Sequence, residues 1–127
     1  MKLLLDTHAL LWWLGDDARL GAAARDLIEG RDNVVIVSHA SLWEIAIKVG
    51  IGKLRLDLGD AVAAIRSRGL DELGLTLPHL LVLASLERHH RDPFDHMLIA
   101  QAISEGATLM TADDQIRAYP VAQLGCA

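Results

Sequence analysis

The sequence contains a single cysteine, Cys126, so the chain cannot form an internal disulfide and has no cysteine cluster for zinc. Both absences suit a reducing compartment, and we therefore expect a cytoplasmic protein. No apolar run is long enough to span a membrane. The apolar N-terminus only briefly resembles a signal peptide, because Asp6 and His8 interrupt it and no small-residue cleavage site follows.

Positive charge is also scarce, since 12 Lys and Arg residues face 17 Asp and Glu residues, for a formal net charge of −5. This balance argues against a protein that holds nucleic acid mainly through a basic surface. It leaves open a nuclease whose acids gather around a metal. The sequence has no GxxxxGK[ST] loop, no GxGxxG and no GxSxG, so it gives no support to those nucleotide-binding folds or to a serine hydrolase.

What remains is a chain of 127 residues, 52% of them apolar, without repeats or linkers. This length predicts one domain over residues 1–127, in which folding buries roughly two-thirds of the chain's surface. Hydrophobic patterning and turn residues predict strands at 2–6, 34–37, 73–77, 108–111 and 121–124. Helices are expected at 8–14, 20–29, 41–49, 60–67, 78–88, 93–106 and 113–118. This alternation indicates an α/β fold with a mostly parallel sheet and helices on both faces.

Four acids stand out by position: Asp6, Glu44, Asp95 and Asp113. Asp6 and Asp113 follow predicted strands, where ligands bind in open α/β sheets. Glu44 and Asp95 lie on predicted helices. Carboxylates in such a group repel one another, so they need a cation or some of them must stay protonated, and Mg²⁺ and Mn²⁺ prefer oxygen ligands. The four acids together therefore predict a metal site.

Each acid also has a structural explanation. Asp6 and Asp113 suit helix caps, and Asp95 could favour the first turn of its helix through the helix dipole. Asp92, directly before Pro93, is best interpreted as an N-cap. These alternatives stay open for each acid singly, while the joint occurrence favours a site.

Glu44 could complete a capping box with Ser41 or form an i,i+4 ion pair with Lys48. The rest of this helix is apolar on all sides, which predicts that it is buried. Its polar stripe of Ser41, Glu44 and Lys48 should then face a polar cavity or an edge of the fold.

Several other polar and aromatic residues carry weaker signals. A metal site at His89, His90, Asp92 and His96 matches no known zinc spacing, so solvated or capping histidines are favoured. Packing is favoured for His8 and His39, and core or partner contacts are favoured for the three tryptophans. Phosphate contacts by Arg88, Arg91 and Lys48 stay open, with a solvated surface as the default for the two arginines.

Four segments of the sequence resemble the motifs of a known family. The segments Leu3–Trp12, Ser38–Lys48 with Gly52–Leu54, His90–Ala102 and Leu109–Asp113 are similar to the four motifs of PIN domains, in particular the VapC toxins. The motifs occur in the family's order and cover nearly the whole chain. None of the four family acids is missing.

The resemblance implies a PIN-like three-layer sandwich and an endoribonuclease dependent on Mg²⁺ or Mn²⁺. It implies that Asp6, Glu44, Asp95 and Asp113 form the catalytic metal site. In a supporting role, Thr111 would orient a water or a neighbouring acid. Thr7, Asp92 and Lys48 are further supporting candidates.

The resemblance also implies partners. It predicts an RNA substrate, a homodimer, and a VapB-type antitoxin that blocks the active site and can build a larger hetero-oligomer. DNA would be reached only through the antitoxin, since this chain has no DNA-binding motif. Two rival hypotheses stay open. One is another metal-dependent phosphoesterase, such as a phosphatase with an aspartyl nucleophile, although His8 occupies the place of its usual second acid. The other is a non-catalytic module with the PIN fold.

Overall fold

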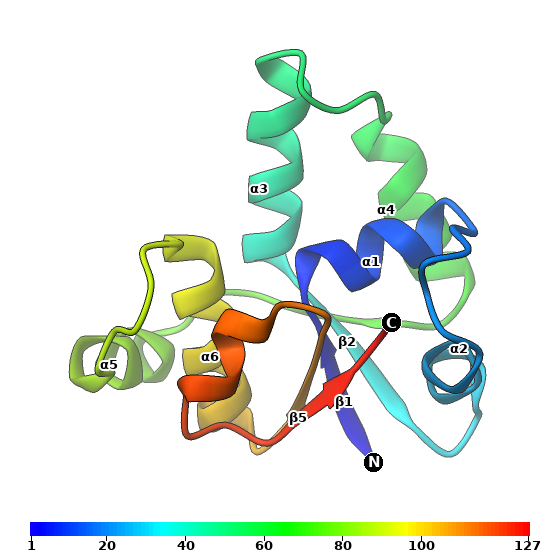
Figure 1. The fold of residues 1–127 in the computed structure, drawn as a ribbon. Helices are drawn as coiled ribbons and strands as arrows, with labels where there is room; N and C mark the ends of the chain where they lie inside the picture. Colours follow the sequence, from blue (N-terminus) through cyan, green and yellow to red (C-terminus); the bar gives the residue numbers. More distant parts are fainter.

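A computed structural model describes all of residues 1–127. Five parallel strands form one sheet in the order β3-β2-β1-β4-β5, flanked by helices (Figure 1). The strands are β1 (Lys2–Leu5), β2 (Val34–Ser38), β3 (Asp71–Leu73), β4 (Thr108–Thr111) and β5 (Gln123–Gly125). The helices are α1 (Thr7–Leu14), α2 (Ala22–Glu29), α3 (His39–Gly50), α4 (Leu58–Ser67), α5 (Leu77–Ser85), α6 (Pro93–Glu105) and the 3₁₀ helix η1 (Asp114–Ala118).

The central strands are apolar on both faces, and this creates the layered architecture. In β1, Leu3 and Leu5 pack into one core cluster with residues of α1, α2 and α4, while Leu4 packs into a second cluster with α6. Successive side chains of a strand point to opposite faces, so a strand without polar alternation must be covered on both. Figure 1 shows α1, α2 and α4 on one side of the sheet and α5 and α6 on the other. The predicted α/β sandwich is confirmed.

Several element boundaries differ from the sequence prediction. The third strand, expected at 73–77, is Asp71–Leu73, because Thr76 already caps α5 and Pro78 occupies its first turn. That helix ends at Ser85, three residues earlier than expected. The last strand, expected at 121–124, is Gln123–Gly125. No helix is both long and apolar enough to cross a membrane.

The prediction that α3 is buried on all sides is wrong. Trp43 is 60% exposed and Ile47 is 40% exposed, whereas the polar residues Ser41 and Glu44 are buried. The helix therefore turns its polar stripe toward the protein and part of its apolar surface toward solvent. The helix also begins at His39 and is capped by Ser38, so the proposed capping box between Ser41 and Glu44 does not exist.

The strand order places a topological switch point beside β1. The chain passes from β1 to β2 and β3 in one direction and continues on the other side of β1 with β4 and β5. At such a point the connections leave the carboxyl ends of two adjacent strands in opposite directions, which opens a crevice. Asp6 follows β1 and Asp113 follows β4, so both lie at this crevice.

Candidate metal centre

Asp6 lies directly after β1 with its side chain almost fully buried. One carboxyl oxygen accepts a hydrogen bond from the backbone N–H of Ala9 at 2.7 Å and thereby caps α1. Burial raises the pKa of Asp6 above its ordinary value, and a hydrogen bond with Thr111 opposes this rise. Asp6 is thus a helix cap and also an acid with a perturbed pKa at the switch point. The two alternatives left open by the sequence are compatible.

Thr111 and Asp113 come from the end of β4, which pairs directly with β1. The backbone N–H of Asp113 donates to the Thr111 hydroxyl oxygen at 3.0 Å, and Asp113 Oδ1 accepts from the N–H of Gln115 at 2.9 Å. The negative charge of Asp113 contributes to the raised pKa of Asp6. Thr111 therefore connects the two acids, as it interacts with the carboxyl group of one and the backbone of the other.

Asp95 lies in the first turn of α6, a helix on the opposite face of the sheet from α1. Asp92 caps this helix by accepting hydrogen bonds from the backbone N–H groups of Phe94 and Asp95. The Asp95 carboxyl group lies 3.0 Å from Nε2 of His90. Burial raises the pKa of Asp95 to about 6, the hydrogen bond to His90 opposes this, and the charges of Asp92 and Asp6 add to it. Asp95 is thus electrostatically linked to the acid after β1.

These side chains form a group that fits a divalent cation. His90, Asp95 and Asp113 offer ligand atoms that all lie within 4.8 Å of one another. Asp6 interacts electrostatically with both of these acids. Carboxylate oxygens are the ligands that Mg²⁺ and Mn²⁺ prefer, and a cation would relieve the cost of burying Asp6 and half-burying Asp95. The donor set of three carboxylates therefore fits such an ion.

Neither Asp6 nor Glu44 belongs to the group within 4.8 Å, and only Asp6 interacts electrostatically with its acids. The buried carboxylate of Glu44 instead forms an ion pair with Lys48, one turn further along α3, at 2.8 Å. The predicted i,i+4 pair is therefore present. Thr7 donates a hydrogen bond from its hydroxyl to Ser41 Oγ at 3.1 Å, which fastens α3 to the start of α1 beside Asp6. The structure thus gathers Asp6, Asp95 and Asp113 and leaves Glu44 neutralised by a lysine.

Comparison with known proteins identifies the family to which this chain belongs. The model of the PIN domain family matches residues 3–122. This chain belongs to the PIN domain family. Ribonuclease VapC22 of Mycobacterium tuberculosis is 26% identical over 119 residues, which cover 91% of this PIN domain and 90% of the relative.

Two solved structures share the fold of this PIN domain. VapBC2 from Rickettsia felis, bound to a DNA fragment of its promoter, has a TM-score of 0.78 at 17% identity and covers 100% of both chains. DNA-bound VapBC from Salmonella typhimurium has a TM-score of 0.70 at 18% identity and covers 100% of this chain and 99% of the other. At these identities the likeness concerns the fold.

From the sequence, His90 is a candidate only as part of a zinc-like cluster, and Tyr119 of this PIN domain is given no role. Solvated or capping histidines were favoured at 89–96, yet His90 and His96 are largely buried and His90 contacts Asp95. Tyr119 is buried and hydrogen-bonded to the His90 ring at 2.7 Å. The motif His90–Ala102 points to this region, but no local pattern links His90 to Tyr119, which is 29 residues further along the chain.

The arginines left open by the sequence lie close to the acidic group. Arg88 and Arg91 line a pocket of about 570 Å³ together with His90 and His96. Neither arginine forms an ion pair, so both guanidinium groups are free to contact an anion. Beside Asp113, a smaller hollow of about 300 Å³ is lined by His8, Trp12 and Arg19.

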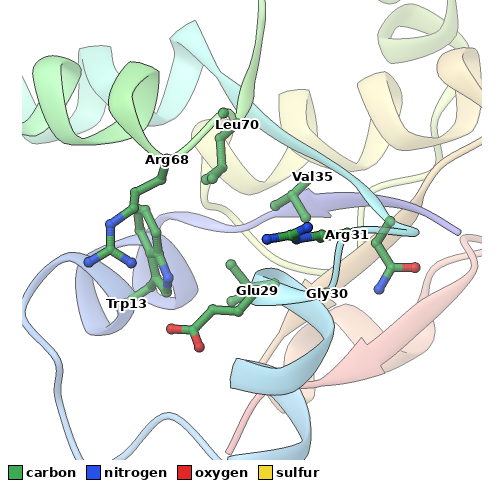
Figure 2. Close-up of a pocket in the computed structure, with 10 residues that line it drawn as sticks. Trp13, Glu29, Gly30, Arg31, Val35, Arg68 and Leu70 are labelled. Carbon is green, nitrogen blue, oxygen red and sulfur yellow. The ribbon is translucent and has the colours of Figure 1, made fainter.

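A further pocket lies at the opposite edge of the sheet. It has a volume of about 380 Å³ and is lined by Trp13, Arg31 and Arg68 among others, next to the starts of β2 and β3 (Figure 2). It contains none of the predicted site residues. Its two arginines are also free of ion pairs, which makes the pocket a useful reference for the pocket around Arg88 and Arg91.

Proposed function

We propose that this PIN domain, spanning residues 1–127, is an endoribonuclease that hydrolyses RNA phosphodiester bonds with Mg²⁺ or Mn²⁺. The observation that carries the proposal is the meeting of Asp6, Asp95 and Asp113 at the switch point, where Asp6 is buried, Asp95 is half-buried and both have raised pKa values. A folded protein does not gather buried acids without compensation, and a divalent cation supplies it. The family and the ribonuclease relative support the same activity.

In this mechanism Asp6, Asp95 and Asp113 would hold the cation, and Glu44 would be a fourth ligand if its ion pair with Lys48 were broken. When bound, the ion supplies a Lewis acid that lowers the pKa of a water and offsets charge on the phosphate. One carboxylate accepts the proton of the attacking water while the 3′-oxygen leaves in line with it. Thr111 holds the Asp6 carboxyl group in orientation through its hydroxyl.

RNA reaches the acids through contacts with its phosphates. Arg88 and Arg91 are the free cations next to His90 and Asp95, and their pocket is suited to a phosphate neighbouring the scissile one. This local positive charge offsets the repulsion expected between RNA and a chain with a net charge of −5. Binding therefore depends on a few placed arginines instead of a broad basic surface.

We further propose that the protein is the cytoplasmic toxin of a VapBC-type pair. The solved structures with this fold include VapBC complexes, two of them with DNA. Trp43, Ile47 and Ile51 of the α3 region and Leu77 and Leu81 of α5 are at least 40% exposed and suit contacts with a partner protein. These contacts would serve a homodimer and a VapB-type antitoxin that covers the acidic site, in an assembly that can grow to a larger hetero-oligomer. Operator DNA is contacted through the antitoxin.

The activity test compares two variants that each remove one negative charge. Asp6→Asn should abolish cleavage of RNA in Mg²⁺ or Mn²⁺, because it removes a proposed metal ligand. Asp32→Asn is the matched control, because Asp32 is exposed before β2 at the opposite edge of the sheet. Chelation with EDTA should stop cleavage by the wild type. Cleavage at the wild-type rate by purified Asp6→Asn, or indifference to EDTA, would contradict the proposal.

A further inference from the structure

Tyr119 holds the loop between α5 and α6 against the acidic group. Its hydroxyl oxygen accepts hydrogen bonds from the backbone N–H groups of His89 at 2.8 Å and His90 at 3.2 Å. Tyr119 is only 4% exposed, so water does not compete for these contacts. The phenol thus fixes the backbone of the residue whose ring contacts Asp95.

The same hydroxyl decides which ring nitrogen of His90 carries a proton. A phenolic oxygen accepts about two hydrogen bonds, and the two backbone N–H groups already supply them. Its own hydrogen is therefore directed at Nδ1 of His90, which lies 2.7 Å away. Nδ1 must then be the unprotonated nitrogen, and Nε2 carries the ring proton. That proton is donated to Oδ2 of Asp95 at 3.0 Å.

The position of the His90 ring is fixed from a second direction. His96 donates from Nε2 to the backbone carbonyl oxygen of His90 at 2.7 Å. The two imidazole rings pack edge to face, with centroids 4.9 Å apart. His96 is itself buried in α6, the helix that also carries Asp95. The donor and the acceptor of the His90–Asp95 hydrogen bond are thus both held by the same helix.

We propose that His90 is a positioning residue that orients the Asp95 carboxylate through the chain Tyr119–His90–Asp95, and that it is not a metal ligand. Proximity alone suggests a ligand, because His90 belongs to the group within 4.8 Å. A ligating nitrogen must have lost its proton, however, and the bonding pattern keeps the proton on Nε2. The hydrogen bond from His90 occupies one carboxyl oxygen of Asp95 and leaves the other oxygen for the cation. This inference rests on the proposed metal-dependent function.

The tautomer can be tested by ¹⁵N NMR of the histidine rings, with the His90 signals assigned by their absence in His90→Gln. We expect the pattern of a neutral ring protonated at Nε2, both without metal and in saturating Mg²⁺. In Tyr119→Phe, which lacks the hydroxyl but keeps the ring, this preference for one tautomer should weaken, because only the Asp95 carboxylate then favours the proton on Nε2. Loss of the Nε2 proton when Mg²⁺ is added to the wild type would overturn the proposal. So would a ring protonated at Nδ1 in the metal-free protein.

A second test measures Mn²⁺ affinity by calorimetry in the absence of RNA. His90→Ala should weaken Mn²⁺ binding by about 10- to 100-fold, as expected when a metal ligand loses its hydrogen-bonding partner. His90→Gln keeps an N–H donor at the end of its side chain and should restore most of the affinity and of kcat, with KM for RNA unchanged in both variants. His39→Ala is the control for Mn²⁺ affinity, because His39 is exposed and pairs with Glu72.

The outcomes separate the two proposals. A wild-type protein that binds no Mn²⁺ would contradict the proposed function itself. Equal Mn²⁺ affinity of the wild type and His90→Ala would contradict only the positioning role. Equal reductions in His90→Ala and His90→Gln would also overturn it, because the retained N–H donor would then make no difference.

Discussion

Nζ of Lys48 lies 2.8 Å from the carboxylate of Glu44, and this ion pair neutralises a predicted site acid that lies outside the group formed by His90, Asp95 and Asp113. The Glu44 side chain is only 9% exposed, whereas that of Lys48 is 36% exposed. The lysine can therefore move into solvent, and the glutamate cannot. Lys48 supplies the positive charge that a metal would supply to Glu44 in the loaded site.

The first prediction concerns Lys48→Met, which keeps the approximate length of the side chain and removes its charge. The metal-free variant should lose about 1–2 kcal/mol in free energy of unfolding, less than the ~3–5 kcal/mol for a fully buried pair, because Lys48 is partly exposed. Saturating Mn²⁺ should stabilise Lys48→Met more than the wild type, since the metal relieves the unpaired Glu44. Urea unfolding in EDTA and in Mn²⁺ measures both effects.

Arg66→Met is the control for this experiment. It breaks the exposed ion pair between Arg66 and Glu72, away from the acidic group, and should leave the response to Mn²⁺ unchanged. Equal stabilisation of the wild type and Lys48→Met by Mn²⁺ would place Glu44 outside the metal site.

The second prediction follows from the pKa of Asp95, which burial raises to about 6 from the ordinary 3.8. The folded metal-free protein binds this proton more tightly than the unfolded chain. Stability should therefore fall as the pH rises from about 4 to about 6, and the full penalty should be present above that range. Asp95→Asn removes the penalty and should raise the free energy of unfolding at pH 7.5 by about 1–2 kcal/mol, after discounting for solvent screening.

Unfolding in EDTA between pH 4 and pH 8 measures this effect, and the slope between pH 4 and 6 should be flatter in Asp95→Asn. The variant keeps a side-chain oxygen that can accept the hydrogen bond from His90. A clear decrease in stability at pH 7.5 would instead assign Asp95 a mainly structural role in the first turn of α6.

The sequence was sufficient for the architecture and for part of the site. Runs such as Val34–Val37 have no polar alternation and so indicate strands covered on both faces. Because parallel strands end at one edge, acids after β1 and β4 had to lie near each other. Asp92 before Pro93 also correctly predicted a helix start. These inferences need only local patterns and one rule of topology.

The remaining features depend on contacts that no local pattern encodes. The role of His90 follows from Tyr119, which lies 29 residues away and reaches it only in the folded chain. The exposure of Trp43 could not be predicted, because periodicity places apolar residues on a helix face without saying what covers that face. The pairing of Glu44 with Lys48, in contrast, was open as an alternative at the correct spacing.

The third prediction compares two helix caps. Asp92→Ala removes the acceptor for the Phe94 and Asp95 amides and should cost about 1 kcal/mol in stability. It should also reduce RNA cleavage, because the first turn of α6 carries Asp95. Asp57→Ala removes the cap of α4, where Asp57 accepts from the amide of Asp60, and should cost a similar amount while activity stays unchanged.

Thermal unfolding and initial cleavage rates, the latter recorded well below the midpoint of the weaker variant, separate stability from activity. Equal activity of the two cap variants would show that the position of Asp95 does not depend on the Asp92 cap.

The fourth prediction concerns RNA binding by the pocket of Arg88 and Arg91. Replacing both with alanine should raise KM for RNA and leave kcat nearly unchanged, because these side chains bind phosphates away from the reacting bond. The logarithm of affinity should also depend less steeply on the logarithm of salt concentration, by roughly one unit for each phosphate that an arginine no longer neutralises. Binding to catalytically inactive Asp6→Asn, with and without the two changes, measures affinity without cleavage.

The matched control is the double alanine variant of Arg31 and Arg68, which removes the same charge from the pocket at the opposite edge of the sheet (Figure 2). A general effect of net charge acts over the whole surface and would weaken RNA binding in both double variants. Loss of a specific contact between an arginine and a phosphate would weaken RNA binding only in the variant of Arg88 and Arg91, whose pocket lies beside the acids. If affinity and salt dependence decrease to the same extent in both variants, the RNA is held by overall charge, and the pocket beside His90 has no special part in binding.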